Sequence, residues 1–245
     1  MNIVIPMAGL SQRFVNAGFT IPKYMLYAKE KSLFSISVSS FNKYFKNTKF
    51  IFIVRNVFSS DEFVKKESSR LGILDYEIVV LNNPTLGQAD TVYQGAKKSS
   101  ISLDEPILIF NIDTFRQDFT FPKKIKNWDG YLEVFIGEGN NWSYAKTENK
   151  TSNKVVHVAE KVPISNFCST GIYFFRELKQ FNSAFLKAFD NYKSGNLKEI
   201  YVAPLYNELI SNGDEIYIDL IERDEVVFCG IPNEYFDYIK NIYNE

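Results

Sequence analysis

The sequence predicts an α/β fold built on a mostly parallel sheet with helices on both faces. Short runs rich in Val, Ile and Phe recur at residues 3–5, 50–54, 78–81 and 107–112 without polar alternation. Between them lie stretches whose apolar residues have helical spacing. Strands that are buried on both faces show such unbroken apolar runs, and helices that separate them cover a parallel sheet.

The helices expected in the first half span residues 32–45, 61–71 and 88–98. The first carries four apolar residues on one face. The second has Ser60 as a possible N-cap and Gly72 at its end. The strands at 3–5, 50–54, 78–81 and 107–112 then alternate with these helices, as βαβ units do.

The second half is less regular and predicts a small mixed sheet or lid. The expected strands are residues 130–136, 154–158, 171–175, 215–220 and 226–228. The expected helices are residues 177–192, 202–211 and 233–243, and residues 139–153 and 192–196 are expected to be loops. No internal repeat or linker divides the chain, so a single domain is expected over residues 1–245.

Composition excludes several classes of function. The formal net charge is −1 and no long basic stripe is present, so a nucleic-acid partner is not expected. No signal-like or long apolar segment occurs, so we expect a cytoplasmic protein without a membrane span. His157 is the only histidine, which argues against histidine-based hydrolysis or zinc sites. Cys168 and Cys229 are expected to be buried free thiols.

Two segments follow strands at the edge where ligands bind in a parallel sheet. The first contains Ala8 and Gly9, whose small side chains let backbone N–H groups approach phosphate, and Ser11 and Arg13 add a hydroxyl and a planar cation. Lys23 follows a little later, after Pro22. Taken alone, this loop fits an ordinary strand-to-helix turn as well as a phosphate site.

The second segment is residues 111–113, which contains Asn111 and ends in Asp113. A carboxylate at a strand end is well placed for Mg²⁺, which commonly uses one or two protein carboxylates plus substrate oxygens. The alternative is a turn or N-cap aspartate. The coincidence of a phosphate-compatible loop and a carboxylate at neighbouring strand ends favours the ligand site.

Several motifs together resemble those of the sugar-nucleotidyltransferase family. They are IPMAGLSQRF…IPKYML from residue 5, PTLGQADT from residue 84, FNID ending at Asp113, AEK at 159–161 followed by STGIYF, and GIP at 230–232. The resemblance covers nearly the whole chain. It implies a Rossmann-like, GT-A-like nucleotidyltransferase fold, with residues 1–127 as the nucleotide-binding half and 128–245 as the acceptor-binding half.

The resemblance also implies a role for each matching residue. Arg13, Lys23 and Asp113 would be catalytic, with Arg13 on the leaving phosphates, Lys23 at the α-phosphate and Asp113 on Mg²⁺. The nucleotide would be held by Ala8, Gly9, Leu10, Ser11, Asn83, Gly87, Gln88, Ala89 and Asn111. The acceptor would face Ser143, Tyr144, Glu160, Lys161, Gly171 and Tyr173.

Two departures from the family pattern stand out. Leu10 and Ser11 occupy a stretch where the family usually has glycine. Residues 227–229 supply no oxygen ligand where the family usually has a second metal ligand. Either Mg²⁺ has one protein carboxylate, or another residue such as Asp219 or Asp237 contributes.

Three further stretches resemble a capsule-associated subgroup of the family: WSYAK from residue 142, VAEKVPIS from residue 158 and YVAPLYN from residue 201. That likeness implies CTP as the nucleotide, L-phosphoglutamine as the acceptor and a place in capsule phosphoramidate synthesis. The alternatives are a hexose-1-phosphate nucleotidyltransferase and a catalytically silent nucleotide-binding relative. The sequence leaves the oligomeric state open.

Overall fold

The computed structural model describes residues 1–244. Four parallel strands of the first half form one side of the main sheet, in the order β6-β1-β4-β5. They are β1 (Asn2–Pro6), β4 (Lys49–Arg55), β5 (Tyr76–Leu81) and β6 (Ile107–Phe110). All four strands were predicted, and the mostly parallel central sheet is confirmed.

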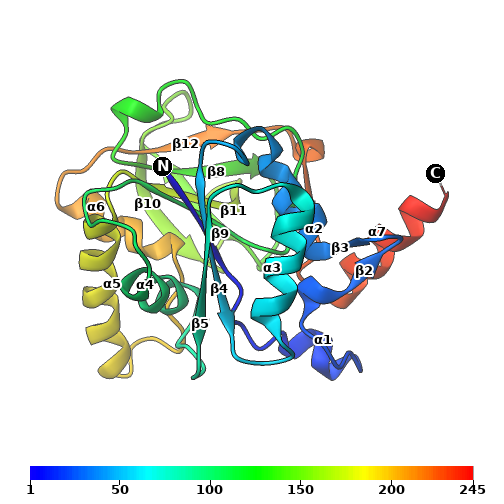
Figure 1. Cartoon of the computed structure of the whole chain (residues 1–245). Helices are drawn as coiled ribbons and strands as arrows, with labels where there is room; N and C mark the ends of the chain where they lie inside the picture. Colours follow the sequence, from blue (N-terminus) through cyan, green and yellow to red (C-terminus); the bar gives the residue numbers. More distant parts are fainter. Residues whose placement is uncertain (245) are drawn as a thin grey trace.

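Helices cover both faces of this sheet, as predicted. In Figure 1, α4 (Gln88–Lys98) and α5 (Leu178–Lys193) lie on one side, and α2 (Leu33–Val38) and α3 (Ser60–Leu71) lie on the other. The bounds of α4 match the prediction. Gly72 ends α3 in the left-handed region at φ 77°, as expected for a C-cap. Ser60 is the first residue of α3 and Ser59 is its N-cap; the Ser60 hydroxyl donates back to the Val57 carbonyl at 2.5 Å and does not cap the helix.

The second half extends the same sheet with five more strands. β11 (Phe167–Phe175) pairs antiparallel with β6, with β8 (Gly130–Ile136) and with β9 (Ser143–Thr147). β10 (Val155–Glu160) pairs with β9, and β12 (Ile216–Leu220) pairs with β8. The helices of this half are α5, α6 (Tyr206–Ser211) and α7 (Pro232–Asn244).

Short elements surround the carboxyl ends of β1 and β6. They include the two-stranded sheets β2 (Tyr27–Ala28) with β3 (Lys31–Ser32) and β7 (Thr114–Arg116) with β13 (Val226–Phe228). The helix α1 (Gln12–Asn16) and 3-10 turns η1 (Lys23–Met25), η2 (Ser39–Tyr44), η3 (Ile125–Asn127), η4 (Ala203–Leu205) and η5 (Arg223–Glu225) complete the fold.

Two predicted segments differ from the structure. The single helix expected at 32–45 is α2 followed by η2, with Phe41 out of helical geometry at φ −105°. Serine hydroxyls compete with the helix there, since Ser39 Oγ donates to the Ser35 carbonyl at 2.7 Å. The loop expected at 139–153 contains strand β9, which antiparallel pairing with β10 stabilises.

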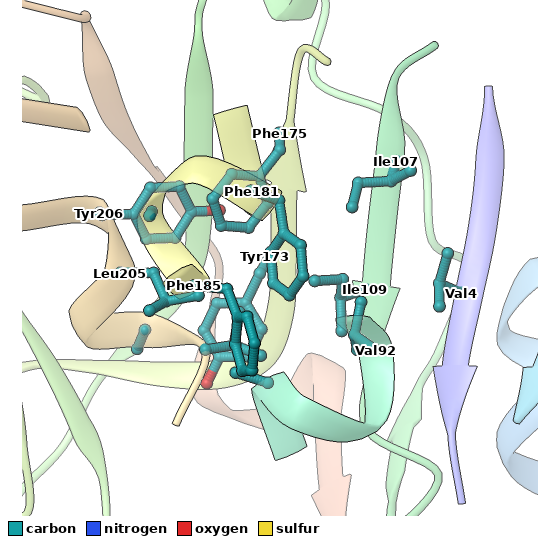
Figure 2. Packing of buried hydrophobic residues seen from close by; sticks show 14 of the residues in the cluster. Val4, Val92, Ile107, Ile109, Tyr173, Phe175, Phe181, Phe185, Leu205 and Tyr206 are labelled. Atoms are coloured by element: carbon teal, nitrogen blue, oxygen red, sulfur yellow. The ribbon is translucent and has the colours of Figure 1, made fainter. Parts of the chain in front are cut away.

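Two large clusters of buried side chains form the core, one on each face of the sheet. Figure 2 shows the first, in which Tyr206 lies beside Phe175 and Phe181. The rings of Phe175 and Tyr206 stack at 4.5 Å. Cys168 and Cys229 are free and buried, as predicted. None of the helices within residues 1–244 has the length and apolar character needed to cross a membrane.

The Tyr206 hydroxyl is a buried link between strands. Its single O–H is shared between the carbonyls of Tyr131 and Phe174, each 2.8 Å away, and these residues face each other in the β8–β11 pairing. We expect Tyr206→Phe to lower the free energy of unfolding by about 1–2 kcal/mol, because both carbonyls lose a buried donor. Urea denaturation measures the loss.

Tyr217→Phe is the matched control, because its hydroxyl reaches only the exposed Glu215 carboxylate at 3.3 Å. Its stability is expected to stay within about 0.5 kcal/mol of the parent protein. Equal denaturation midpoints for the Tyr206 and Tyr217 variants would contradict the prediction.

Candidate active site

The loop after β1 turns sharply at Ser11. Ser11 lies in the left-handed region at φ 50°, immediately before α1. A residue other than glycine has a cost of roughly 1–2 kcal/mol in this conformation. This is the stretch where the family resemblance leads one to expect glycine. The turn directs Arg13, in the first turn of α1, into the space beyond the carboxyl end of β1.

Lys23 and Asp113 meet across this space. Pro22 precedes η1, which begins at Lys23, and the Lys23 Nζ lies 2.5 Å from Asp113 Oδ2. Both side chains are partly exposed, at 20% and 25%. Asp113 is held by its neighbours, because its carbonyl accepts from the Cys229 N–H at 2.8 Å and Gly230 packs directly against its carboxylate.

Two adjoining cavities open at this edge of the sheet. The loop cavity, of about 480 Å³, contains Gly9, Ser11 and Lys23 in its lining. The hairpin cavity, of about 510 Å³, is lined by Trp142, Glu160 and other residues of the β9–β10 hairpin. Seven residues line both: Arg13, Gln88, Asn111, Asp113, Lys161, Tyr201 and Gly230. The two cavities therefore form one cleft, with the Lys23–Asp113 pair at their junction.

Four of the nine residues predicted for nucleotide binding line the loop cavity: Gly9, Ser11, Gln88 and Asn111. The Gln88 side-chain amide donates to the Asn111 side-chain oxygen, which joins the start of α4 to the end of β6. The other five residues predicted for nucleotide binding line neither cavity: Ala8, Leu10, Asn83, Gly87 and Ala89. Ala8 and Ala89 are buried and Asn83 is exposed, whereas Leu10 lines a third cavity of about 450 Å³ that shares Gly9 and Ser11 with the loop cavity.

Gly87 shapes the start of α4 without entering the cleft. Its φ is 130°, and a Cβ on it would lie 2.6 Å from the Ile200 carbonyl oxygen. Ile200 also accepts from the Ala89 N–H at 3.0 Å and donates to the Leu86 carbonyl at 2.8 Å. Only glycine allows this close contact between residues 86–89, here called the base loop, and residues 199–201.

The residues predicted for the acceptor line the hairpin cavity, with one exception. Ser143 donates to Glu160, and burial raises the pKa of the Glu160 carboxyl, whereas Ser143 and Lys161 act to lower it. Burial also raises the pKa of Tyr173 to about 12, so its hydroxyl stays a neutral donor. Tyr144 is the exception: it is buried away from the cavity and donates to the Gly139 carbonyl.

Gly171 approaches Asn111 more closely than any other residue type could. Its φ is 94°, and a Cβ on it would lie 2.5 Å from the Asn111 side-chain nitrogen. We expect Gly171→Ala to displace Asn111, to cost about 1–3 kcal/mol of stability and to raise the nucleotide KM by about tenfold. Thermal denaturation and initial-rate kinetics measure the two effects.

Gly213→Ala is the control for this substitution. Gly213 has nearly the same φ, 92°, but nothing lies within 4 Å of an added Cβ. It therefore carries the backbone cost without the collision. An unchanged nucleotide KM in Gly171→Ala, or the same rise in Gly213→Ala, would contradict the role given to the Gly171–Asn111 contact.

Sequence reasoning gave no site role to several residues that line the cleft. Glu199 and Tyr201 line the loop cavity, and Glu138 and Glu234 line the hairpin cavity. Glu234 Oε2 accepts from the N–H groups of Gly230 and Ile231 at 2.7 and 3.2 Å, which caps α7. The sequence feature that could have identified Glu234 is its position in the first helical turn after the GIP motif.

The carboxylates in the cleft limit which residues could bind a metal ion. Within residues 1–244, no group of three or more His, Cys, Asp and Glu side chains could hold one. Asp219 lies near Arg116 and Glu225, and Asp237 is exposed on α7, so neither lines the cleft. Asp113 and Glu234 do line it, and both carboxylates lie beside Gly230. Their oxygens suit a hard cation that takes its remaining ligands from substrate and water.

The chain is similar to a nucleoside-diphosphate-sugar pyrophosphorylase from Vibrio cholerae RC9, with 48% identity over 97% of this chain and 99% of that chain and a TM-score of 0.93. The inositol-1-phosphate CTP transferase from T. maritima shares 13% identity over 98% and 95% of the chains, with a TM-score of 0.74.

A UDP-glucose pyrophosphorylase bound to UDP-glucose shares 14% identity over 99% and 98%, also with a TM-score of 0.74. Together, these structures confirm the predicted nucleotidyltransferase fold. No protein-family model matches the sequence, and no curated protein matches it.

Proposed function

The chain belongs to the nucleoside-diphosphate-sugar pyrophosphorylase family of nucleotidyltransferases, and from this we propose that it transfers a nucleoside monophosphate to a phosphorylated small molecule. We propose CTP as the donor and L-phosphoglutamine as the acceptor, with pyrophosphate as the second product, in capsule synthesis. We also assign residues 1–127 to nucleotide binding and 128–245 to acceptor binding. The observation that carries the proposal is the Lys23–Asp113 pair at the junction of the two cavities.

The proposed reaction is a single in-line displacement. An oxygen of the acceptor phosphate in the hairpin cavity attacks the α-phosphorus of the nucleotide in the loop cavity. The α–β phosphoanhydride bond breaks, and its electron pair leaves with pyrophosphate. The acceptor oxygen is already anionic, so no general base is required. Catalysis then consists of positioning and charge neutralisation.

The cationic side chains of the cleft suit this reaction. Lys23, at the junction, would neutralise charge at the α-phosphate, and Arg13 would hold the β- and γ-phosphates as they leave. Gln88 and Asn111, joined by a hydrogen bond, would border the nucleotide. Lys161 lines both cavities and would contact the acceptor phosphate.

Asp113 would hold Mg²⁺, and Glu234 is the second carboxylate available beside Gly230. The bound ion would supply charge neutralisation to the phosphates. Asp219 and Asp237 do not line the cleft and are not candidate ligands.

The charge of the hairpin cavity supports an acceptor that carries an ammonium group. Four carboxylates line it, from Asp113, Glu138, Glu160 and Glu234, against the cations Arg13 and Lys161. The rings of Trp142 and Phe228, 4.6 Å apart, also line this cavity, and aromatic faces attract cations. With Asp113 and Glu234 assigned to Mg²⁺, Glu138 and Glu160 are the carboxylates left to accept from an α-ammonium group, which a hexose lacks.

A hexose-1-phosphate is the second candidate acceptor. The relative from Vibrio cholerae RC9, 48% identical, is described as a nucleoside-diphosphate-sugar pyrophosphorylase, which favours a sugar. A catalytically silent relative is a third possibility. The presence of Arg13, Lys23 and Asp113 in one cleft argues against it, because a silent protein need not keep all three.

Pyrophosphate release tests these alternatives. ATP, CTP, GTP and UTP are each supplied with L-phosphoglutamine and with hexose-1-phosphates, in the presence of Mg²⁺. Release only with CTP and L-phosphoglutamine supports the first candidate. Release with a hexose-1-phosphate overturns it in favour of the second. Nucleotide binding with no release from any pair would favour the silent relative.

A further inference from the structure

Tyr201 lies at the junction of the loop and hairpin cavities and lines both. It belongs to the segment between α5 and η4, far in sequence from the other residues of the junction. The reaction as proposed above gives it no role. Its hydroxyl contacts two charged residues that line the same cleft, Lys161 and Glu199, which indicates a specific function.

The first contact is with Lys161. The Lys161 Nζ donates to the Tyr201 hydroxyl at 2.5 Å and lies 4.4 Å from the centre of the tyrosine ring. The ammonium therefore has both a hydrogen-bond acceptor and the negative face of an aromatic ring. Both contacts come from the one Tyr201 side chain.

Lys161 needs such a partner to keep a fixed position. Its side chain is 44% exposed and has four rotatable bonds, and its φ of 57° is unusual for a residue other than glycine. Within residues 1–244, the one carboxylate paired with it is that of Glu160, at 3.8 Å. Without Tyr201, the Lys161 ammonium would be free to turn toward Glu160 or into solvent.

Tyr201 is itself held in place from two directions. Its hydroxyl donates to Glu199 Oε2 at 2.5 Å, so an oxygen lone pair remains to accept from Lys161. The neighbouring Ile200 exchanges backbone hydrogen bonds with Leu86 and Ala89 of the base loop. The position of the Lys161 ammonium is thus tied to the loop that we expect to border the nucleotide.

We propose that Tyr201 is a positioning residue that holds the Lys161 ammonium at the junction, where it meets the acceptor phosphate. This inference rests on the proposed function, because Lys161 is assigned to the acceptor only there. It predicts that loss of Tyr201 weakens acceptor binding through Lys161 alone. Nucleotide binding and the fold are expected to stay unchanged.

Two substitutions separate the two contacts. Tyr201→Phe keeps the ring and removes the hydroxyl, and we expect the acceptor KM to rise about tenfold, as for loss of one hydrogen bond to a charged group. Tyr201→Leu removes both contacts, and we expect it to raise the acceptor KM to about thirty times the parent value or more. In both variants the nucleotide KM is expected to stay within about twofold of the parent value.

Tyr243→Leu is the matched control. The Lys29 ammonium lies over the Tyr243 ring at 5.5 Å, but outside the cleft. No kinetic constant is expected to change in this variant. A rise in acceptor KM for Tyr243→Leu equal to that for Tyr201→Leu would mean that the Tyr201 effect is not specific to the cleft.

A double-mutant cycle with Lys161→Met decides whether Tyr201 acts through Lys161. We expect Tyr201→Phe to have no further effect on the acceptor KM in the Lys161→Met background. A tenfold rise in both backgrounds would overturn the proposal, because Tyr201 would then act independently of the lysine.

Inorganic phosphate provides a measurement that needs no turnover. A ³¹P NMR titration gives its dissociation constant for the parent protein and each variant of the cycle. Tyr201→Phe should weaken phosphate binding only when Lys161 is present, and equal weakening in both backgrounds, or none, overturns the proposal. If the parent protein releases no pyrophosphate with any substrate pair, the proposed function fails, and this titration still tests Tyr201.

Discussion

Lys23→Ala is expected to lower turnover by about 10²–10³-fold, the scale seen when one preorganised charge-stabilising group is removed from an active site. The Lys23 ammonium lies 2.5 Å from Asp113 Oδ2, at the junction of the two cavities. In the proposed reaction it neutralises the α-phosphate, where charge grows as the leaving group departs. An alanine leaves that charge without a partner.

The loss should appear in turnover and not in folding. Both partners of the ion pair are partly exposed, at 20% and 25%, so breaking it costs little stability. Far-UV circular dichroism and thermal denaturation should match those of the parent protein. Lys179→Ala is the matched control, since Lys179 forms a 2.9 Å pair with Asp104 on the exposed surface.

Asp113→Asn is expected to lower turnover on a similar scale, because it keeps the shape of the side chain and removes the charge that would hold Mg²⁺. In the Lys23→Ala/Asp113→Asn double variant the two losses should combine to less than their product, as for residues that act as a unit. If either single variant keeps more than about a tenth of parental turnover, that residue is not part of the proposed mechanism.

The parallel half of the fold was predictable because its signals are local. Each buried strand is an unbroken apolar run, and the bounds of α4 follow from periodicity and its flanking residues. The strands that were not predicted are short or depend on partners distant in sequence. β7 pairs with β13 more than a hundred residues later, and the β9–β10 hairpin joins the main sheet only where β9 meets β11. No local pattern specifies such pairings.

The strand ends that form the cleft were also predictable, since Arg13, Lys23 and Asp113 follow strands of one sheet. Tyr201 and Glu199 were not, because only the tertiary contact between Ile200 and the base loop brings them into the cleft. Tyr144 was placed in the acceptor site along with Ser143. Adjacent residues of a strand face opposite sides of a sheet, and here Ser143 faces the cavity while Tyr144 is buried.

The largest effect on stability is expected from Arg116→Met. The Arg116 Nε donates to both oxygens of Glu133 at 3.1 and 3.0 Å, and both residues are buried. Thr170 also donates to Glu133, at 2.9 Å. The pair connects β7, the strand that follows Asp113, to β8 of the main sheet. Breaking it leaves a buried carboxylate unpaired, which costs about 3–5 kcal/mol.

Equilibrium urea denaturation measures this loss, and two further variants define its origin. Lys154→Met breaks an exposed pair, Lys154–Glu215 at 2.9 Å, and should cost less than about 1 kcal/mol. Arg116→Met/Glu133→Leu removes both buried charges and should recover part of the stability lost in the single variant. If the double variant is no more stable than Arg116→Met, the loss comes from packing and not from the unpaired charge.

The pH dependence of Arg116→Met gives an independent test. Burial raises the pKa of Glu133 from 4.5 to about 7, even with Arg116 and Thr170 acting to lower it, and removal of Arg116 raises it further. Between the unfolded pKa of 4.5 and the raised folded pKa, Glu133 is protonated in the folded protein but ionised in the unfolded chain. Stability must therefore fall as pH rises through this window. The Arg116→Met variant should lose more stability at about pH 8 than at about pH 5, relative to the parent protein. A loss that is equal at both values would show that Glu133 does not carry the uncompensated charge.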